Sequence, residues 1–200
     1  MRDQKPTLLT KRFQEALVYT AQLHAHQVRK GNNTPYIAHL LSVSSLVLEA
    51  GGDEDQAIAA LLHDAVEDQG GQQTLDEIRA RFGDRVADIV DSCSDAYVIP
   101  KPPWRQRKDD YVAHLPEASS DARLVSLADK LHNARSILRD LQLEGNQVWE
   151  KFNGGRDGTL WYYQKLATIF SDTDRGFLVD EFNSVVAKIK QIADLDNKEL

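Results

Sequence analysis

The sequence predicts an all-α fold, in the form of a compact multi-helix bundle. Across its 200 residues, apolar side chains recur at steps of three and four, which is the period of an amphipathic helix. The sequence carries no convincing alternation of apolar and polar residues, the pattern that indicates a half-buried strand. Segments rich in glycine and proline separate the periodic stretches. We therefore expect a single domain over residues 1–200.

Turn-forming residues divide the chain into its expected helices. The segment 29–35, which contains Gly31 and Pro35, ends the first helix, and the pair Gly51-Gly52 ends the second. Thr74, followed three residues later by Glu77, is typical of a capping box and so predicts a helix start. Prolines at 100, 102 and 103 predict a loop, and a polar, glycine-rich connection is expected over 153–158. The helices are expected at 9–28, 36–50, 53–68, 75–81, 84–94, from about 105, and at 121–141, 160–170 and 175–193.

Composition excludes several classes of protein. The net charge of −7 argues against nonspecific nucleic-acid binding, which depends on neutralising phosphates with Lys and Arg. No apolar run approaches the roughly 20 residues that span a bilayer. Residues 1–11 lack the apolar core of a secretory signal, and the single cysteine, Cys93, rules out an internal disulfide framework. We expect a cytoplasmic protein that contacts neither membrane nor nucleic acid.

The segment 59–68 carries the strongest chemical signal. Small and aliphatic residues lead directly into His63-Asp64, and the acidic pair Glu67-Asp68 follows within one helical turn. Burying such groups costs on the order of several kcal/mol unless something neutralises them, and a divalent metal takes imidazole and carboxylate ligands. In a continuous helix, His63 and Glu67 project from nearly the same side, as do Asp64 and Asp68. The pattern predicts a hydrolytic site in which the first pair binds metal and the second activates water.

Other segments supply further donors. His39 lies early in the second predicted helix, and Asp129 interrupts an otherwise aliphatic one. Asn133 and Ser136 follow Asp129 at steps of four and three, so these residues form a polar stripe apart from the aliphatic one. Taken alone, His39 is more readily a core or surface histidine than a ligand, and only the other donors favour it as one. Asp129 could pair with Lys130 or Arg135 at the surface. The remaining histidines are not expected to bind metal, although His24 could lie behind the pocket.

Several blocks of the chain, within residues 16–140, resemble an HD-domain phosphohydrolase of the RelA/SpoT type, and in particular the stand-alone small alarmone hydrolases. These blocks are Ala21–His24 with Gln27–Lys30, Thr34–His39, Ala59–Asp68, Arg81–Gly83 and Leu127–Arg135. The resemblance implies a helical HD-domain bundle. The C-terminal helices, at about 159–195, lie outside the matched blocks and are expected to pack on it.

The resemblance also implies roles for individual residues. The metal ligands would be His39, His63, Asp64 and Asp129, and the ion would be Mn²⁺. The ligand set alone equally suits Fe²⁺ or Zn²⁺. The acidic pair, Glu67 and Asp68, would orient and activate the attacking water.

Five residues would contact the substrate. Arg29 would stack on the nucleotide base, as a planar guanidinium does well, and Lys30 would lie near the phosphates. Tyr36 would line the pocket, and Asn133 and Ser136 would contact the base and sugar. The chain departs from the family at Leu40, His26 and Gln69, near the expected base pocket. These departures leave the base open.

The expected activity is hydrolysis of the 3′-pyrophosphate of a nucleotide alarmone, either (p)ppGpp or (p)ppApp. Too few residues follow the hydrolase blocks for the family's synthetase domain, so we expect hydrolysis without alarmone synthesis. Two alternatives stay open. The protein could remove the 2′-phosphate of NADPH or cleave another nucleotide phosphoester, or it could bind a nucleotide without turnover. The partner is a small-molecule nucleotide in each case, and a homo-oligomer is possible.

Three features permit more than one interpretation. The aromatic residues 161–163 predict a helix that packs on the core, or else one that covers a side of the pocket or forms a dimer contact. Trp104 could be a stacking surface or a loop anchor. The basic cluster Arg105, Arg107 and Lys108 could reach substrate phosphates or form a solvated helix start.

Overall fold

The computed structural model describes residues 7–31, 33–94 and 100–195, and it confirms the all-α prediction. The described residues form helices and a single isolated β-bridge, between Val28 and Pro35. The α-helices are α1 Lys11–Leu23, α2 Ile37–Glu49, α3 Glu54–Leu62, α4 Ala65–Gln69, α5 Gln72–Phe82, α6 Asp84–Cys93, α7 Trp104–His114, α8 Ser120–Glu144, α9 Gly155–Thr173 and α10 Phe177–Leu195. The 3₁₀ helices are η1 Leu115–Glu117 and η2 Gly145–Lys151.

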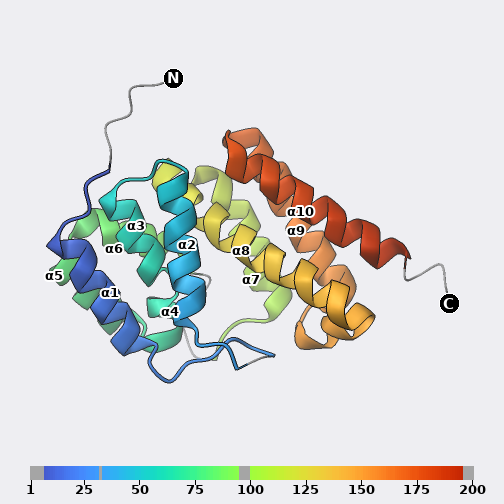
Figure 1. The fold of residues 1–200 in the computed structure, drawn as a ribbon, viewed down its shortest axis with the longest axis horizontal. Coiled ribbons are helices and arrows are strands. Elements are labelled where there is room, and N and C mark those ends of the chain that lie inside the picture. The colour runs from blue at the N-terminus through green and yellow to red at the C-terminus, as the bar shows by residue number, and fades with distance from the viewer. Residues whose placement is uncertain (1–6, 32, 95–99, 196–200) are drawn as a thin grey trace.

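Helix α8 is the central element of the bundle. It packs against α2, α3 and α6 on one side and against α9, α10 and η2 on the other, as Figure 1 shows. Helix α3 lies inside the first group, and every side chain from Ala57 to Leu62 is fully buried. A helix that is apolar all round belongs in the interior. The end of α3 therefore delivers the His-Asp pair into the interior of the fold.

Capping residues explain where several helices begin. The Asp53 side chain accepts a hydrogen bond from the backbone of Gln56, whose own side chain bonds back to Asp53, so a capping box starts α3. Ser119 caps α8 by accepting from the backbone of Ala122. The capping box predicted at Thr74 is wrong. Helix α5 already begins at Gln72, and the Thr74 hydroxyl instead donates to the carbonyl of Gln69 at 3.1 Å.

Two predicted helix boundaries also needed correction. The first helix ends at Leu23 rather than at residue 28, because Val28 pairs with Pro35 and the backbone N–H of Arg29 donates to Thr34 at 2.9 Å. This short hairpin-like loop carries Arg29 and Lys30. The connection expected over 153–158 is shorter than predicted, because α9 already begins at Gly155.

The C-terminal helices share the core of the bundle. Phe170 on α9 and Phe182 on α10 are fully buried, with ring centroids 5.6 Å apart in an edge-to-face arrangement. Within the described part of the chain, the length and apolar character needed to cross a membrane are found in no helix.

Candidate metal and nucleotide site

The His-Asp pair lies at a break between two helices. His63 is the C-cap of α3, and Asp64 is the N-cap of the five-residue helix α4. The continuous helix expected over this segment is therefore wrong, and so is the angular argument that depended on it. The break places the pair at a junction, while Glu67 and Asp68 belong to the separate helix α4.

Four ligand-type side chains converge at this junction. The Nε2 atom of His39 lies 3.2 Å from Asp129 Oδ1 and 3.5 Å from Asp64 Oδ2. The Nε2 atom of His63 lies 3.0 Å from Asp64 Oδ2 and 3.6 Å from Asp129 Oδ1. They come from α2, α8 and the α3–α4 junction, so the fold gathers residues that are 90 positions apart in the chain.

The imidazole nitrogens fit a divalent cation. The ligand atoms of His39, His63 and Asp129 all lie within 4.8 Å of one another. Among the residues that the structure describes, neither buried Nε2 atom of His39 and His63 has a hydrogen-bond partner, a costly arrangement unless a ligand satisfies them. Each opposite nitrogen is engaged, His63 Nδ1 with the carbonyl of Ala60 and His39 Nδ1 with His132 Nδ1, both at 2.8 Å. Because a carbonyl can only accept, His63 Nδ1 must donate, and its neutral ring then leaves an unprotonated Nε2 facing the other ligand-type groups.

Asp64 and Asp129 supply negative charge to this group. Although burial disfavours an ionised carboxyl, His63 holds the pKa of Asp64 well below its usual range, and Lys130 does the same for Asp129. The Lys130 ammonium lies 2.7 Å from Asp129 Oδ2, and the Tyr36 hydroxyl donates to Asp64 Oδ2 at 2.7 Å. Burial opposes protonation of His63, yet the two carboxylates raise its pKa well above the usual value. This shift favours the protonated imidazole of His63, so a bound cation would compete with a proton for Nε2.

The acidic pair lies one turn away with partners of its own. Glu67 Oε1 accepts from Lys101 at 2.8 Å and lies 4.0 Å from Arg107 Nη1. Asp68 Oδ2 accepts from the amide of Gln27 at 2.8 Å. Partial burial, together with the negative charge of Asp64, raises the pKa of Asp68, which suits a group that accepts a proton.

Gln27 is the centre of a small network behind Asp68. Its oxygen accepts hydrogen bonds from the Gln69 amide and from His24 Nδ1, both at 2.6 Å. His24 is buried and stacks on Tyr36 with ring centroids 5.5 Å apart, in the supporting position expected for it. Gln69, one of the departures from the family, therefore helps to orient the group that holds Asp68.

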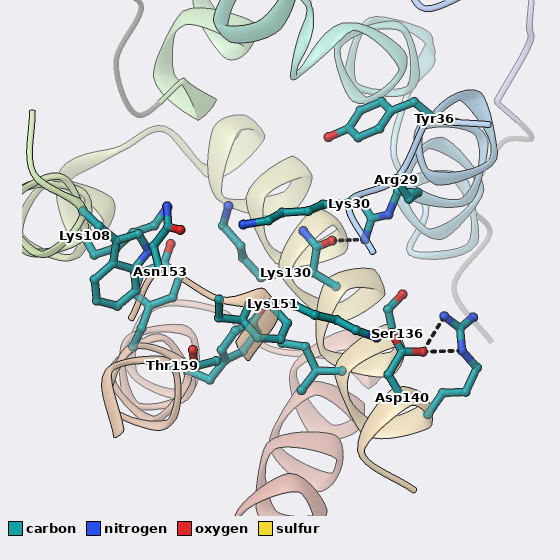
Figure 2. A pocket seen from close by; sticks show the side chains of 17 residues that line it. Arg29, Lys30, Tyr36, Lys108, Lys130, Ser136, Asp140, Lys151, Asn153 and Thr159 are labelled. Carbon is teal, nitrogen blue, oxygen red and sulfur yellow. Dashed lines mark hydrogen bonds and ion pairs between the residues drawn. The ribbon is translucent and has the colours of Figure 1, made fainter. Parts of the chain in front are cut away.

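A cavity of about 370 Å³ opens beside the ligand cluster, and Figure 2 shows it from close by. All five residues predicted to contact the substrate line it: Arg29, Lys30, Tyr36, Asn133 and Ser136. Arg29 Nη2 donates to Asn133 Oδ1 at 2.7 Å, and Asn133 Nδ2 donates to Asp129 Oδ1 at 2.6 Å. The chain Arg29–Asn133–Asp129 thus connects the cavity to the ligand cluster. Ser136 instead directs its hydroxyl to the backbone carbonyl of His132.

Three further lysines line this cavity. Lys108, Lys130 and Lys151 come from α7, α8 and η2. Together with Arg29 and Lys30 they give the cavity a basic lining in a protein whose net charge is −7. Lys130 and Lys151 were not predicted from the sequence as site residues. Lys130 follows Asp129 directly, which was a usable signal, whereas nothing in the sequence near Lys151 points to the cavity.

The residues at the start of α7 have different surroundings. Trp104 packs on two glycines, since a Cβ added to Gly154 would lie 2.5 Å from its ring and one added to Gly158 would lie 3.1 Å away. Trp104 is thus an anchor between α7 and α9 that also lines the cavity. Arg105 stacks on Trp161 at 3.6 Å and does not line the cavity.

Helix α9 serves two of the roles considered for it, core packing and lining of the pocket. Its residues Tyr162 and Tyr163 belong to the buried core. Together with Thr159 they also form a wall of the cavity. The C-terminal segment therefore contributes both to packing and to the site.

Known proteins are similar to this chain in sequence and in fold. The HD-domain family model matches residues 16–160. The chain is 42% identical over 128 residues to the guanosine-3′,5′-bis(diphosphate) 3′-pyrophosphohydrolase MESH1 of Xenopus tropicalis, covering 62% of this chain and 69% of that protein. The human enzyme of the same name is 40% identical over the same shares.

Solved structures agree with the sequence comparison. A structure described as a metazoan orthologue of SpoT that hydrolyses ppGpp matches with a TM-score of 0.75 and 31% identity, covering 91% of this chain and 97% of that one. A protein from Listeria monocytogenes EGD-e matches with a TM-score of 0.64 and 32% identity, covering 78% of this chain and 99% of that one. With the family model matched over most of its length, the chain belongs to the HD-domain family, as a phosphohydrolase of the RelA/SpoT type.

Proposed function

We propose that this protein is a Mn²⁺-dependent hydrolase that removes the 3′-pyrophosphate from a nucleotide alarmone, (p)ppGpp or (p)ppApp. The observation that carries the proposal is that a group of buried metal-ligand-type side chains lies next to a basic cavity. Two buried, unpartnered imidazole nitrogens adjoin a cavity lined by arginine and lysine. A cation would coordinate the imidazole nitrogens, and a polyphosphate would neutralise the basic lining of the cavity. The names of the relatives, which specify a guanosine 3′-pyrophosphohydrolase, support the same reaction.

The metal would be held by His39, His63, Asp64 and Asp129. When bound, such an ion lowers the pKa of a coordinated water and polarises a phosphoryl oxygen. Two imidazoles and two carboxylates suit Mn²⁺ among other first-row ions, so manganese follows from the resemblance and is part of the proposal.

Glu67 and Asp68 would handle the proton of the attacking water. Both carboxylates lie on α4, one turn beyond the His-Asp junction. The raised pKa of Asp68 favours its role as proton acceptor, and Gln27 fixes the direction of its carboxylate. Lys101 donates a hydrogen bond to Glu67 Oε1 at 2.8 Å. General-base groups placed in this way typically contribute about 10²- to 10⁴-fold to a rate.

The cavity would hold the remainder of the nucleotide. Arg29 would stack on the base, and its bond to Asn133 fixes the plane of its guanidinium. Lys30 would meet the phosphates, Tyr36 would form the wall beside Asp64, and Ser136 would lie along the base and sugar. The basic lining gives a local field that attracts polyphosphate in spite of the negative total charge. The cytoplasmic location expected from the sequence is part of this proposal.

A product analysis tests the proposal. Metal-stripped protein is incubated with ppGpp, ppApp or NADPH, with and without added Mn²⁺, beside the Glu67→Gln variant. Manganese-dependent release of pyrophosphate from a tetraphosphate by the wild type alone is the expected result, and the faster tetraphosphate identifies the base. Orthophosphate from NADPH alone would replace the proposal with a 2′-phosphatase activity. Binding of nucleotides with no turnover would replace it with a sensing role.

A further inference from the structure

The contact between His39 and His132 is a second determinant of the metal site. The two Nδ1 atoms lie 2.8 Å apart, and the ring centroids are separated by 4.8 Å. A distance of 2.8 Å between two ring nitrogens requires one proton between them. With two protons the N–H groups repel each other, and with none the two lone pairs do. The contact therefore links the tautomer of one ring to that of the other.

Only one of the two proton arrangements permits metal binding through His39. If His39 Nδ1 is the donor, its Nε2 carries a free lone pair toward Asp129, which lies 3.2 Å away. If His132 Nδ1 is the donor, the proton of His39 moves to Nε2 and blocks that lone pair. His63 does not face this choice, because the carbonyl of Ala60 can only accept.

The position of His132 explains how the contact is maintained. His132 lies on α8 three residues after Asp129, so the same helix supplies a ligand and the partner of another ligand. Its backbone carbonyl accepts the hydroxyl of Ser136, which lines the substrate cavity. His39 is itself buried, at 1% exposure, so water does not replace a lost partner at Nδ1.

We infer that His132 is a positioning residue that accepts the Nδ1 proton of His39 and thereby fixes the tautomer in which His39 binds the metal. Its role is to select one protonation pattern of a ligand, and it touches neither substrate nor metal. The inference rests on the metal site and is independent of which nucleotide is hydrolysed.

Metal affinity of purified variants tests this inference. His132→Phe keeps a ring but removes the acceptor, whereas His132→Asn keeps an acceptor near the position of Nδ1. Loss of such a partner typically weakens metal binding about 10- to 100-fold. We expect that loss for His132→Phe, measured with Mn²⁺ and Zn²⁺ by titration calorimetry on metal-stripped protein, and substantial recovery for His132→Asn. The matched control is His114→Phe, because His114 is exposed at the end of α7.

A spectroscopic measurement on the wild type makes the test independent of how the variants fold. Nitrogen-15 shifts of the histidine rings in the Zn²⁺-loaded protein should show His39 protonated at Nδ1 and His132 unprotonated at Nδ1. The opposite assignment, or wild-type metal affinity in folded His132→Phe, would overturn the inference. If the protein bound metal as expected but hydrolysed no tetraphosphate, the proposed function would fail while this inference stood.

Discussion

Asn133 donates its amide hydrogen to the Asp129 carboxylate at 2.6 Å, and with its oxygen it accepts from Arg29 at 2.7 Å. One side chain therefore connects a proposed metal ligand to the residue expected to stack on the base. Because an amide has both a donor and an acceptor, asparagine can make both bonds at once, and a carboxylate cannot.

Replacing Asn133 by Leu should loosen both ends of this connection. We expect the KM for ppGpp to rise about tenfold and Mn²⁺ affinity to fall about tenfold, since a supporting hydrogen bond to a ligand is lost. Steady-state kinetics and calorimetry measure the two effects. The control is Asn183→Leu, because Asn183 lies on α10 and donates to Ser171 on α9, outside the connection between Arg29 and Asp129. An unchanged KM and an unchanged Mn²⁺ affinity would show that the hydrogen bonds of Asn133 to Arg29 and Asp129 contribute nothing to substrate or metal binding.

The acidic pair should affect the chemical step and leave the metal in place. For Glu67→Gln and Asp68→Asn, we expect kcat to fall about 10²- to 10⁴-fold, the usual weight of a general base. Metal affinity should match the wild type, because neither residue belongs to the ligand cluster. Asp76→Asn, at an exposed position on α5, is the control. Metal loss in either variant would instead assign that residue to the coordination sphere.

Metal binding should depend on pH through His63. The pKa of His63 is raised in the metal-free protein, so below that raised pKa the ion must displace a proton. The charged ring stabilises the metal-free fold at low pH, and this stabilisation is lost as the pH rises through the folded-state pKa. Apparent Mn²⁺ affinity should therefore fall, by up to about tenfold per pH unit, as the pH is lowered. Calorimetry in buffers of different ionisation enthalpy measures the proton release. An affinity that does not vary with pH would contradict the prediction.

The packing of Trp104 on α9 should be sensitive to single methyl groups. An alanine Cβ at Gly154 would lie 2.5 Å from the Trp104 ring, so Gly154→Ala should destabilise the fold by about 1–3 kcal/mol and displace the cavity wall. Gly158→Ala, with 3.1 Å available, should cost less, because the ring needs to move only slightly. Thermal unfolding and kcat/KM for ppGpp measure the two effects. An equal response of the two variants would show that Trp104 is not held by this surface.

The C-terminal helices should unfold together with the rest of the protein. Phe182→Ala removes a fully buried ring that packs on Phe170, and it should cost about 3–5 kcal/mol. Phe177→Ala is the control, because Phe177 is 46% exposed. A single denaturant transition, shifted in Phe182→Ala, would support the one-domain prediction for residues 1–200. Two transitions, with only one shifted, would divide the chain into separate units.

Much of this fold was predictable because helical periodicity is a local property. The boundaries of α2 and α6 agree closely with the predicted ranges, since Gly51 and Gly83 mark them in the sequence. The α3–α4 break was not predictable, because no glycine or proline interrupts the segment 59–68. Likewise, no local sequence pattern predicts the pairing of Val28 with Pro35. Tertiary contacts decide these features.

The site shows the same division. Ligand-type residues were recognisable from their chemistry, and the cavity is lined by every residue predicted to contact the substrate. Lys151 and Thr159 lie beyond Arg135, where the last sequence block that resembles the family ends. They reach the cavity because η2 and α9 pack beside α8. His132 was set aside as a non-ligand. Its contact with His39 depends on the crossing of α2 and α8, which no sequence spacing reveals.

The helix break at His63-Asp64 lies between the proposed metal ligand His63 and the acidic pair Glu67 and Asp68, which is proposed to accept the proton. Helix α4 is five residues long, Ala65–Gln69, with Gly70 as its C-cap, so the two carboxylates lie on a short segment of their own. A change in the direction of this short helix would move Glu67 and Asp68 together, while His39 on α2 and Asp129 on α8 would keep their places.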